Sequence, residues 1–167
     1  MSVRLTVLDG EIASRCGDIV TTERDWPCGA GCADCCRSLA AVPEITRAEW
    51  ERLALALAAL APEARAIVGS AVAELRANAA RPIACPLLDP QGLCRVYEAR
   101  PLACRSYGFY ADHEGVLGCD RILARADDGA VVWGNHEALM RAAATLGERR
   151  SLLDWLESDP ILTDSVK

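Results

Sequence analysis

Apolar residues recur at helical spacing in the middle of the chain. Thr46 and Glu49 form a capping box, in which the hydroxyl takes a free N–H of the first turn and the carboxylate returns to the cap, so a helix is predicted to begin at Thr46. Pro62 suits the first turn of a second helix that is expected to run towards Ala80. The apolar stripes are Trp50, Leu53, Leu57 and Leu60 in the first helix and Ile67, Ala71, Val72 and Leu75 in the second. These patterns predict a helical hairpin.

The last third of the chain contains two further helix starts. Asn135 is a favoured N-cap for a helix through Leu146. Ser151 caps a last short helix that is expected to end at Pro160. We therefore predict C-terminal helices over about residues 135–158.

Period-two alternation and turn residues predict a small amount of strand. Val3, Leu5 and Val7 alternate with other residues, which predicts a short strand over residues 2–8. Asp127-Asp128-Gly129 separates residues 122–126 from residues 130–133, and this turn chemistry predicts a β-hairpin.

Two segments rich in Cys, Gly and Pro interrupt these regular patterns. Residues 16–40 and 82–120 are predicted to be loops or broken turns, with one helical turn over residues 94–99 that Pro101 stops. The predicted fold is mainly α, as one small domain over residues 1–167. The helical hairpin is inserted between two cysteine-rich metal-binding loop regions, and one short β-hairpin is added.

Charge and hydropathy exclude some classes of function. The net charge of −6 argues against a nucleic-acid binder, because such proteins need a basic patch that neutralises phosphates. The longest apolar run, residues 53–62, is about half of what a membrane span needs. Asp9, Glu11 and Arg15 interrupt the N-terminal segment, so no signal peptide is predicted. We expect a cytoplasmic protein that binds neither nucleic acid nor membrane, and the sequence leaves its protein partner open.

Nine cysteines are the strongest chemical signal in the sequence. The odd number excludes a fully paired disulfide framework, and in a reducing compartment clustered cysteines bind metal or act in redox chemistry. Gly29 and Gly31 permit the first cluster, C-x3-C-x2-C-C, to curl around one centre. Cys16 has no cysteine nearby and is predicted not to be a ligand. The predicted ligands are Cys28, Cys32, Cys35 and Cys36 in the first group and Cys85, Cys94, Cys104 and Cys119 in the second.

The predicted cofactor is an iron–sulfur cluster, with zinc as the alternative. Cys32-x2-Cys35 fits a zinc knuckle, but the second group contains no such pair, and iron–sulfur clusters accept a scattered fourth ligand. C-x3-C-x2-C is also the [4Fe–4S] spacing of radical S-adenosylmethionine enzymes, although Ala33 replaces their usual aromatic residue and the chain is too short for their barrel. His113 would replace a thiolate in a zinc site, but a surface position is the stronger expectation.

Three arginines directly follow cysteines, and a fourth lies between two cysteines. Guanidinium groups beside thiolates would offset the negative charge of the site, although an arginine-rich composition explains the same pattern. Arg100 is predicted to fix the segment between Cys94 and Cys104 by bonding carbonyls or Glu98. The three that follow cysteines are Arg37, Arg95 and Arg105.

The cysteine segments also carry a family resemblance. Cys28-x3-Cys32-x2-Cys35-Cys36, Cys85-Pro-Leu-Leu and Cys94-Arg-Val-Tyr-Glu-Ala-Arg-Pro-Leu-Ala-Cys104-Arg together resemble the YkgJ-type cysteine-cluster family. The resemblance covers about residues 26–120, and we take this range as the cysteine-cluster core. The family is described as a zinc- or iron-chelating domain or as an iron–sulfur-cluster-containing protein, so the resemblance implies metal binding. Flagellin lysine N-methylases have a similar pattern in a longer chain, and their activity is not implied here.

Three functions are compatible with these observations. The first is an iron–sulfur protein, with a [4Fe–4S] cluster and a redox, electron-transfer or accessory role. The second is a structural zinc module that binds a protein partner, and the third is a small metal-dependent modifying enzyme. Because adjacent side chains diverge, Cys35 is predicted to join Cys28 and Cys32, while Cys36 turns towards the second group. The competing arrangement is a single cluster held by Cys28, Cys32, Cys35 and one distant cysteine, with Cys36 as a buried spectator.

Overall fold

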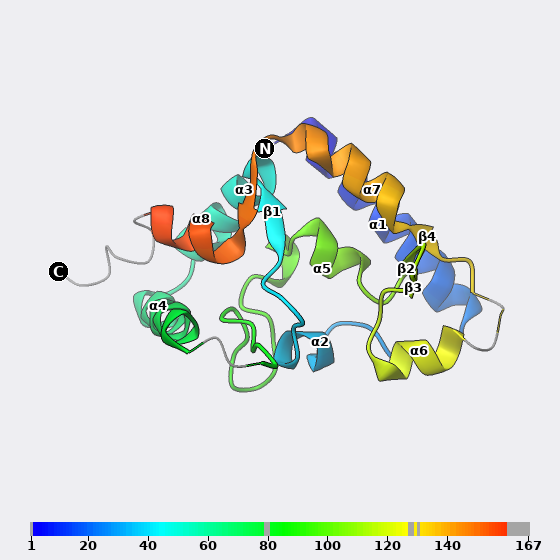
Figure 1. Ribbon diagram of the computed structural model, residues 1–167, viewed down its shortest axis with the longest axis horizontal. Coiled ribbons are helices and arrows are strands. Elements are labelled where there is room, and N and C mark those ends of the chain that lie inside the picture. The colour runs from blue at the N-terminus through cyan, green and yellow to red at the C-terminus, as the bar shows by residue number, and fades with distance from the viewer. Residues whose placement is uncertain (1, 79–80, 127–128, 130, 160–167) are drawn as a thin grey trace.

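Helices make up most of the structure, which also contains a few short strands (Figure 1). The computed structural model describes residues 2–78, 81–126, 129 and 131–159. The predicted mainly α, single-domain fold is confirmed. The helices are α1 (Val3–Thr22), α2 (Asp34–Arg37), α3 (Arg47–Ala58), α4 (Pro62–Ala77), α5 (Leu102–Ser106), α6 (Asp120–Ala126), α7 (His136–Ala143) and α8 (Leu152–Ser158), with 3₁₀ turns η1 (Tyr97–Ala99) and η2 (Ala144–Leu146).

Helices α3 and α4 form the predicted hairpin. The Glu49 N–H donates to Thr46 Oγ1 over 3.4 Å, and the Thr46 N–H donates to Glu49 Oε2 over 2.8 Å, so the predicted capping box is confirmed. Helix α4 begins at Pro62, as predicted. Its buried residues are Val68 and Val72, whereas Ile67 is 53% exposed, so the predicted stripe is wrong at Ile67.

The first of two hydrophobic cores lies where this hairpin meets α8. The Trp50 and Trp155 rings stack with centroids 5.9 Å apart, and the Trp155 indole N–H donates to the Ile45 carbonyl. Cys85 and Cys94 pack against this core. The α3/α4/α8 core consists of Ile45, Trp50, Leu53, Leu57, Val68, Val72, Leu87, Val96, Ala99, Leu152, Trp155 and Leu156.

The second core joins α1 to α5 and α7. Its residues on α1 follow a helical spacing, so the strand predicted over residues 2–8 is wrong, and the loop predicted to begin at residue 16 is wrong as far as Thr22. Ser2 caps the helix by accepting the Leu5 N–H, while Val3 and Val7 remain exposed. The α1/α5/α7 core consists of Leu5, Leu8, Ile12, Ile19, Leu102, Phe109, Tyr110, Leu139, Ala143 and Leu146.

The strands are short and lie elsewhere than predicted. Strand β1 (Glu44–Thr46) pairs antiparallel with β5 (Arg149–Ser151), which holds the start of α3 beside the start of α8. Strand β2 (Tyr110–Asp112) lies between β3 (Gly115–Val116) and β4 (Gly134–Asn135). The β-hairpin predicted over residues 122–133 is wrong in its described part, because α6 occupies residues 120–126 and residues 131–133 form no strand. Residues 127, 128 and 130 of that prediction lie outside the described residues.

The predicted C-terminal helix starts are confirmed. The Asn135 side chain accepts the Ala138 N–H over 2.8 Å, and the Ser151 hydroxyl accepts the Leu153 N–H over 3.2 Å. Helix α8 ends at Ser158, and Pro160 lies outside the described residues. None of the described helices combines the length and the apolar character that crossing a membrane requires.

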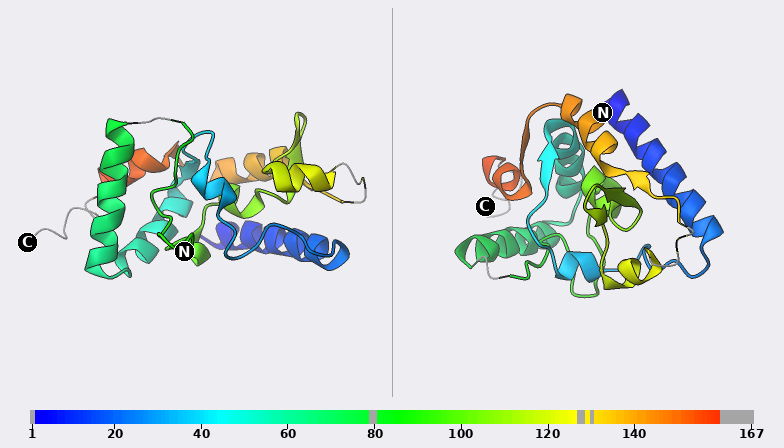
Figure 2. Two further views of the ribbon diagram at one scale, coloured as in Figure 1. Left: turned by 90° about the horizontal axis from the view of Figure 1, so that it is seen from below. Right: turned by 45° about the vertical axis from the view of Figure 1, so that its right-hand side comes forward.

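The cysteine-bearing segments lie between the two cores. Helix α5 lies between α1 and α3, and α2 lies near the base of α5 (Figures 1 and 2). The chain over residues 81–100 runs past α2 before it reaches α5 (Figure 1). This arrangement brings cysteines that are far apart in the sequence to one place.

Candidate metal centre

Seven of the eight predicted ligands line one cavity of about 490 Å³. Apolar residues, among them Leu87 and Val96, form much of the remaining wall. All nine cysteines are free thiols and are half-buried. The seven that line the cavity are Cys28, Cys32, Cys35, Cys36, Cys85, Cys94 and Cys104.

The first cysteine segment curls back on itself as predicted. The Cys32 N–H donates to the Gly29 carbonyl over 3.1 Å, and Gly31 has a φ of +88°, a conformation that glycine adopts without a Cβ clash. The short helix α2 then presents Cys35 and Cys36 on the cavity wall.

Backbone contacts join the first segment to the second. The Cys85 N–H donates to the Cys36 carbonyl over 2.7 Å, and Leu39 and Ile83 form an antiparallel bridge. A second bridge, between Leu88 and Cys94, folds the chain so that Cys94 returns to the cavity beside Cys85. Main-chain pairing therefore brings the two cysteine segments together without metal–ligand bonds.

Helix α5 supplies Cys104 and is held by a buried carboxylate. Glu49 Oε1 accepts the N–H of Leu102 over 2.8 Å, while Oε2 completes the capping box of α3. Glu49 is only 4% exposed, and both of its oxygens accept hydrogen bonds inside the protein. The sequence predicted the capping role of Glu49 but not its contact with α5, because the contact spans 53 positions of the chain.

The thiol of Cys28 lies at one end of the thiol cluster. Burial, and then the neighbouring thiols Cys32, Cys35 and Cys119, raise the pKa of Cys28 to about 12. Its sulfur lies 3.7 Å from the Tyr107 carbonyl. Gly108 has a φ of +86°, and a Cβ on it would come within 3.0 Å of the Cys28 sulfur, so only glycine leaves this space open.

The thiol of Cys36 lies at the other end, with the second group. The sulfurs of Cys35 and Cys36 lie 4.0 Å apart. Cys35 lowers the pKa of Cys36 through this contact, but a hydrogen bond with Cys85 and burial outweigh it and raise the pKa to about 11. Repulsion from Cys94 also raises the pKa of Cys36.

Cys104 joins the same group from α5. Burial, followed by repulsion from Cys36, Cys35 and Cys94, raises its pKa to about 12. Burial also raises the pKa of Cys94, and repulsion from Cys35 adds to this rise. Cys35 therefore influences thiols of both groups, while Cys36 interacts with Cys85, Cys94 and Cys104 of the second group.

Cys119, Cys16 and His113 lie outside the cavity wall. Cys119 precedes α6 and interacts with Cys28, so the structure differs from the predicted grouping of Cys119 with Cys85, because the chain after β3 turns back towards the first segment. Cys16 lies on α1 and points to the Arg105 carbonyl, 3.8 Å away. His113 is 76% exposed and contacts Glu137, as expected for a surface histidine.

The arginines that follow cysteines do not line the cavity. Arg105 instead pairs with Asp9 of α1, and Arg37 packs against Gly92. Arg100 does line the cavity, and its Nε donates to the Tyr97 carbonyl over 3.0 Å, which confirms the predicted bond to a carbonyl. The contacts of Asp9 could not be predicted from the sequence, because they join residues of three separate helices.

The donor set fits a metal that thiolates bind. Thiolate sulfur is the ligand of iron–sulfur clusters and of structural zinc, and the apolar wall would exclude water from either. Among the described residues, no three His, Cys, Asp or Glu side chains stand close enough together to hold one metal ion as they are. The thiols surround a space and do not converge on a point.

Comparisons with known proteins address the family of the chain. The CxxCxxCC family, described as "Putative zinc- or iron-chelating domain", matches residues 27–125. The first interval here is one residue longer than in that family's name, because three residues separate Cys28 from Cys32. No curated protein and no solved structure matches the chain significantly. The match confirms the resemblance predicted from the cysteine segments and supports metal binding, and the chain belongs to the CxxCxxCC family.

Proposed function

We propose that the protein holds an iron–sulfur cluster of the [4Fe–4S] type and has a redox, electron-transfer or accessory role. The observation that carries this proposal is the arrangement of seven thiols around one cavity. A zinc ion draws its sulfurs to about 2.3 Å from one point. An inorganic core of several atoms accepts thiolates that are spread around a larger space, as these are.

Each segment of the chain would contribute in a definite way. Cys28, Cys32 and Cys35 would hold the cluster from the first segment, and Cys36 would reach the thiols of the second. Leu87 and Val96 would limit contact with water. When bound, such a cluster supplies one-electron transfer. The free state of all nine cysteines agrees with a reducing compartment such as the cytoplasm.

A structural zinc site is the second candidate. Cys36, Cys85, Cys94 and Cys104 form a set of four neighbouring thiols, which is the number that a structural zinc ion takes. In this case the metal would complete the fold, and a helical surface would bind a protein partner.

Purification under anaerobic conditions separates the two candidates. Iron, zinc and acid-labile sulfide would be measured per chain, together with the visible absorption spectrum. We expect a brown protein with iron and sulfide in equal amounts. A colourless protein with stoichiometric zinc would replace the iron–sulfur proposal with the zinc one, and a chain that takes up neither metal after reconstitution would overturn both.

A further inference from the structure

Arg100 occupies an unusual position among the cavity residues. Among the described residues that line the cavity, it is the only one with a formally charged side chain. Its guanidinium lies over the Tyr97 ring, 3.5 Å from the centroid, and its Nε donates to the Tyr97 carbonyl. Within the described part of the chain, no carboxylate lies within ion-pair distance of Arg100. A single cation thus faces a group of thiols with its charge unpaired.

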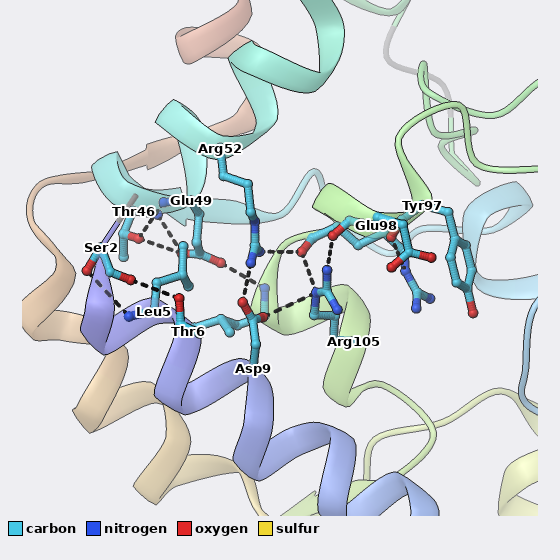
Figure 3. A network of polar contacts seen from close by, with 12 residues as sticks. Ser2, Leu5, Thr6, Asp9, Thr46, Glu49, Arg52, Tyr97, Glu98 and Arg105 are labelled. Atoms are coloured by element: carbon cyan, nitrogen blue, oxygen red, sulfur yellow. Dashed lines mark hydrogen bonds and ion pairs between the residues drawn. The ribbon is translucent and has the colours of Figure 1, made fainter. Parts of the chain in front are cut away.

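The backbone of Arg100 is held by two other arginines. Arg52 Nη2 of α3 donates to the Arg100 carbonyl over 2.7 Å, and Arg105 Nε of α5 donates to the same oxygen over 2.9 Å. Figure 3 shows the side chains of Arg52 and Arg105 beside the carboxylate of Asp9. A carbonyl with two charged donors is fixed more firmly than one with a single neutral donor.

Asp9 of α1 holds the two donors in place. Its carboxylate pairs with Arg52 and lies 3.3 Å from Arg105 Nε (Figure 3). The side chains are largely buried, with 22% of Asp9, 12% of Arg52 and 19% of Arg105 exposed, so the network is poorly screened by water. Asp9 neutralises part of the charge of Arg52 and Arg105. No described carboxylate neutralises Arg100, so its positive charge acts on the thiols of the cavity.

We infer that Arg100 is the charge-compensating residue of the metal centre and that Asp9, Arg52 and Arg105 position it. This inference rests on the proposed metal centre. A site of several thiolates is strongly anionic, and a fixed guanidinium beside it lowers the cost of deprotonating the thiols and of binding them to metal. The geometry agrees, because Arg100 lines the same cavity as the seven thiols.

The test measures Co²⁺ affinity of the full chain by competition with a chelator, using the thiolate–cobalt absorption as the signal. Arg100→Gln should weaken binding roughly 10-fold or more, the range typical when an outer partner of a metal site is removed. Arg100→Lys should recover part of this loss because it keeps the charge. Arg141→Gln on the exposed face of α7 removes the same charge away from the cavity and should leave the affinity unchanged.

A second variant tests the positioning role. Asp9→Asn should weaken Co²⁺ binding, and combining it with Arg100→Gln should cost little more than Arg100→Gln alone, because Asp9 acts through Arg100. Circular dichroism would check that each variant keeps its helices. Equal affinities of wild type and Arg100→Gln would overturn the inference, as would additive losses in the double variant. A wild-type chain that takes up neither iron nor zinc after reconstitution would instead overturn the proposed function.

Discussion

The sulfurs of Cys35 and Cys36 lie 4.0 Å apart on the short helix α2, where the two groups of thiols meet. Cys35 interacts with Cys28 on one side, and Cys36 hydrogen-bonds Cys85 on the other. Adjacent residues of one backbone thus connect both cysteine segments at the cavity wall. The two thiols differ in their surroundings, so their loss should have different effects.

Replacing these two cysteines separately tests divided ligation. We expect Cys35→Ser to lose more metal and sulfide per chain than Cys36→Ser, because Cys35 interacts with thiols of both groups and Cys36 mainly with the second. Iron, zinc and sulfide analysis of the anaerobically purified variants provides the measurement. Unchanged metal content in Cys36→Ser would show that Cys36 is a buried spectator.

Cys16 serves as the matched control for those variants. It lies on α1 outside the cavity, and Cys16→Ser is expected to keep full metal content. Burial raises the pKa of Cys16 to about 11, so its thiol should react slowly with iodoacetamide at neutral pH and faster as the pH rises towards that value. Mass spectrometry of labelled peptides measures the rate. Rapid labelling at neutral pH in the folded protein would contradict this expectation.

Gly108 should be required for the space around Cys28. Gly108→Ala would place a Cβ within 3.0 Å of the Cys28 sulfur, in a backbone conformation that costs an L-residue roughly 1–2 kcal/mol. We expect lower stability and lower metal content. Gly129→Ala is the control, because Gly129 has a φ of +69° but nothing within 4 Å. Similar metal content in the two variants would show that the contact with Cys28 is unimportant for binding.

Metal uptake should depend steeply on pH. Burial and neighbouring thiols raise the pKa of Cys28 and Cys104 to about 12, so these groups are protonated in the metal-free protein at neutral pH. Binding as thiolate must release those protons, and the apparent affinity should therefore rise with pH, by about tenfold per pH unit for each thiol that loses a proton. Calorimetry of Co²⁺ binding in buffers of different ionisation enthalpy counts the released protons. Binding without proton release would contradict thiol ligation.

Removal of the metal should loosen the cysteine segments more than the helices. Residues 28–36 and 85–104 contain little regular structure, and ligand bonds would contribute directly to their order. The α3–α4 hairpin has its own capping box and core, so it should remain helical. Hydrogen exchange of the loaded and metal-free protein compares these regions. Equal protection of residues 28–36 in both forms would exclude this dependence.

Local signals in the sequence were sufficient for several elements. Thr46 and Glu49 lie three residues apart, and Asn135 and Ser151 each cap the helix that follows, so these starts could be predicted. The prediction of a strand over residues 2–8 is wrong because three alternating apolar residues also occur in a helix. Its true pattern, Leu5, Leu8, Ile12 and Ile19, appears only over a longer window.

The candidate site could be predicted only as a set of ligands. The spacing of Cys28, Cys32, Cys35 and Cys36 within one segment indicated a common centre, and they line one cavity. The position of Cys119 and the exposure of Arg100 to the cavity depend on contacts between distant segments. One residue pair within that network, Asp9 and Arg52, is separated by 43 positions, and no local pattern reveals it.

The position of the cysteine segments between two separate cores has a consequence for the lifetime of the protein. The segment that carries Cys85, Cys94 and Cys104 supplies Leu87, Val96 and Ala99 to one core and Leu102 to the other. A chain without metal would keep the two cores, while the loops that carry the cysteines would open to proteases more often. Degradation follows the population of such open forms. The amount of this protein in a cell should consequently rise and fall with the supply of its metal, without any change in its synthesis.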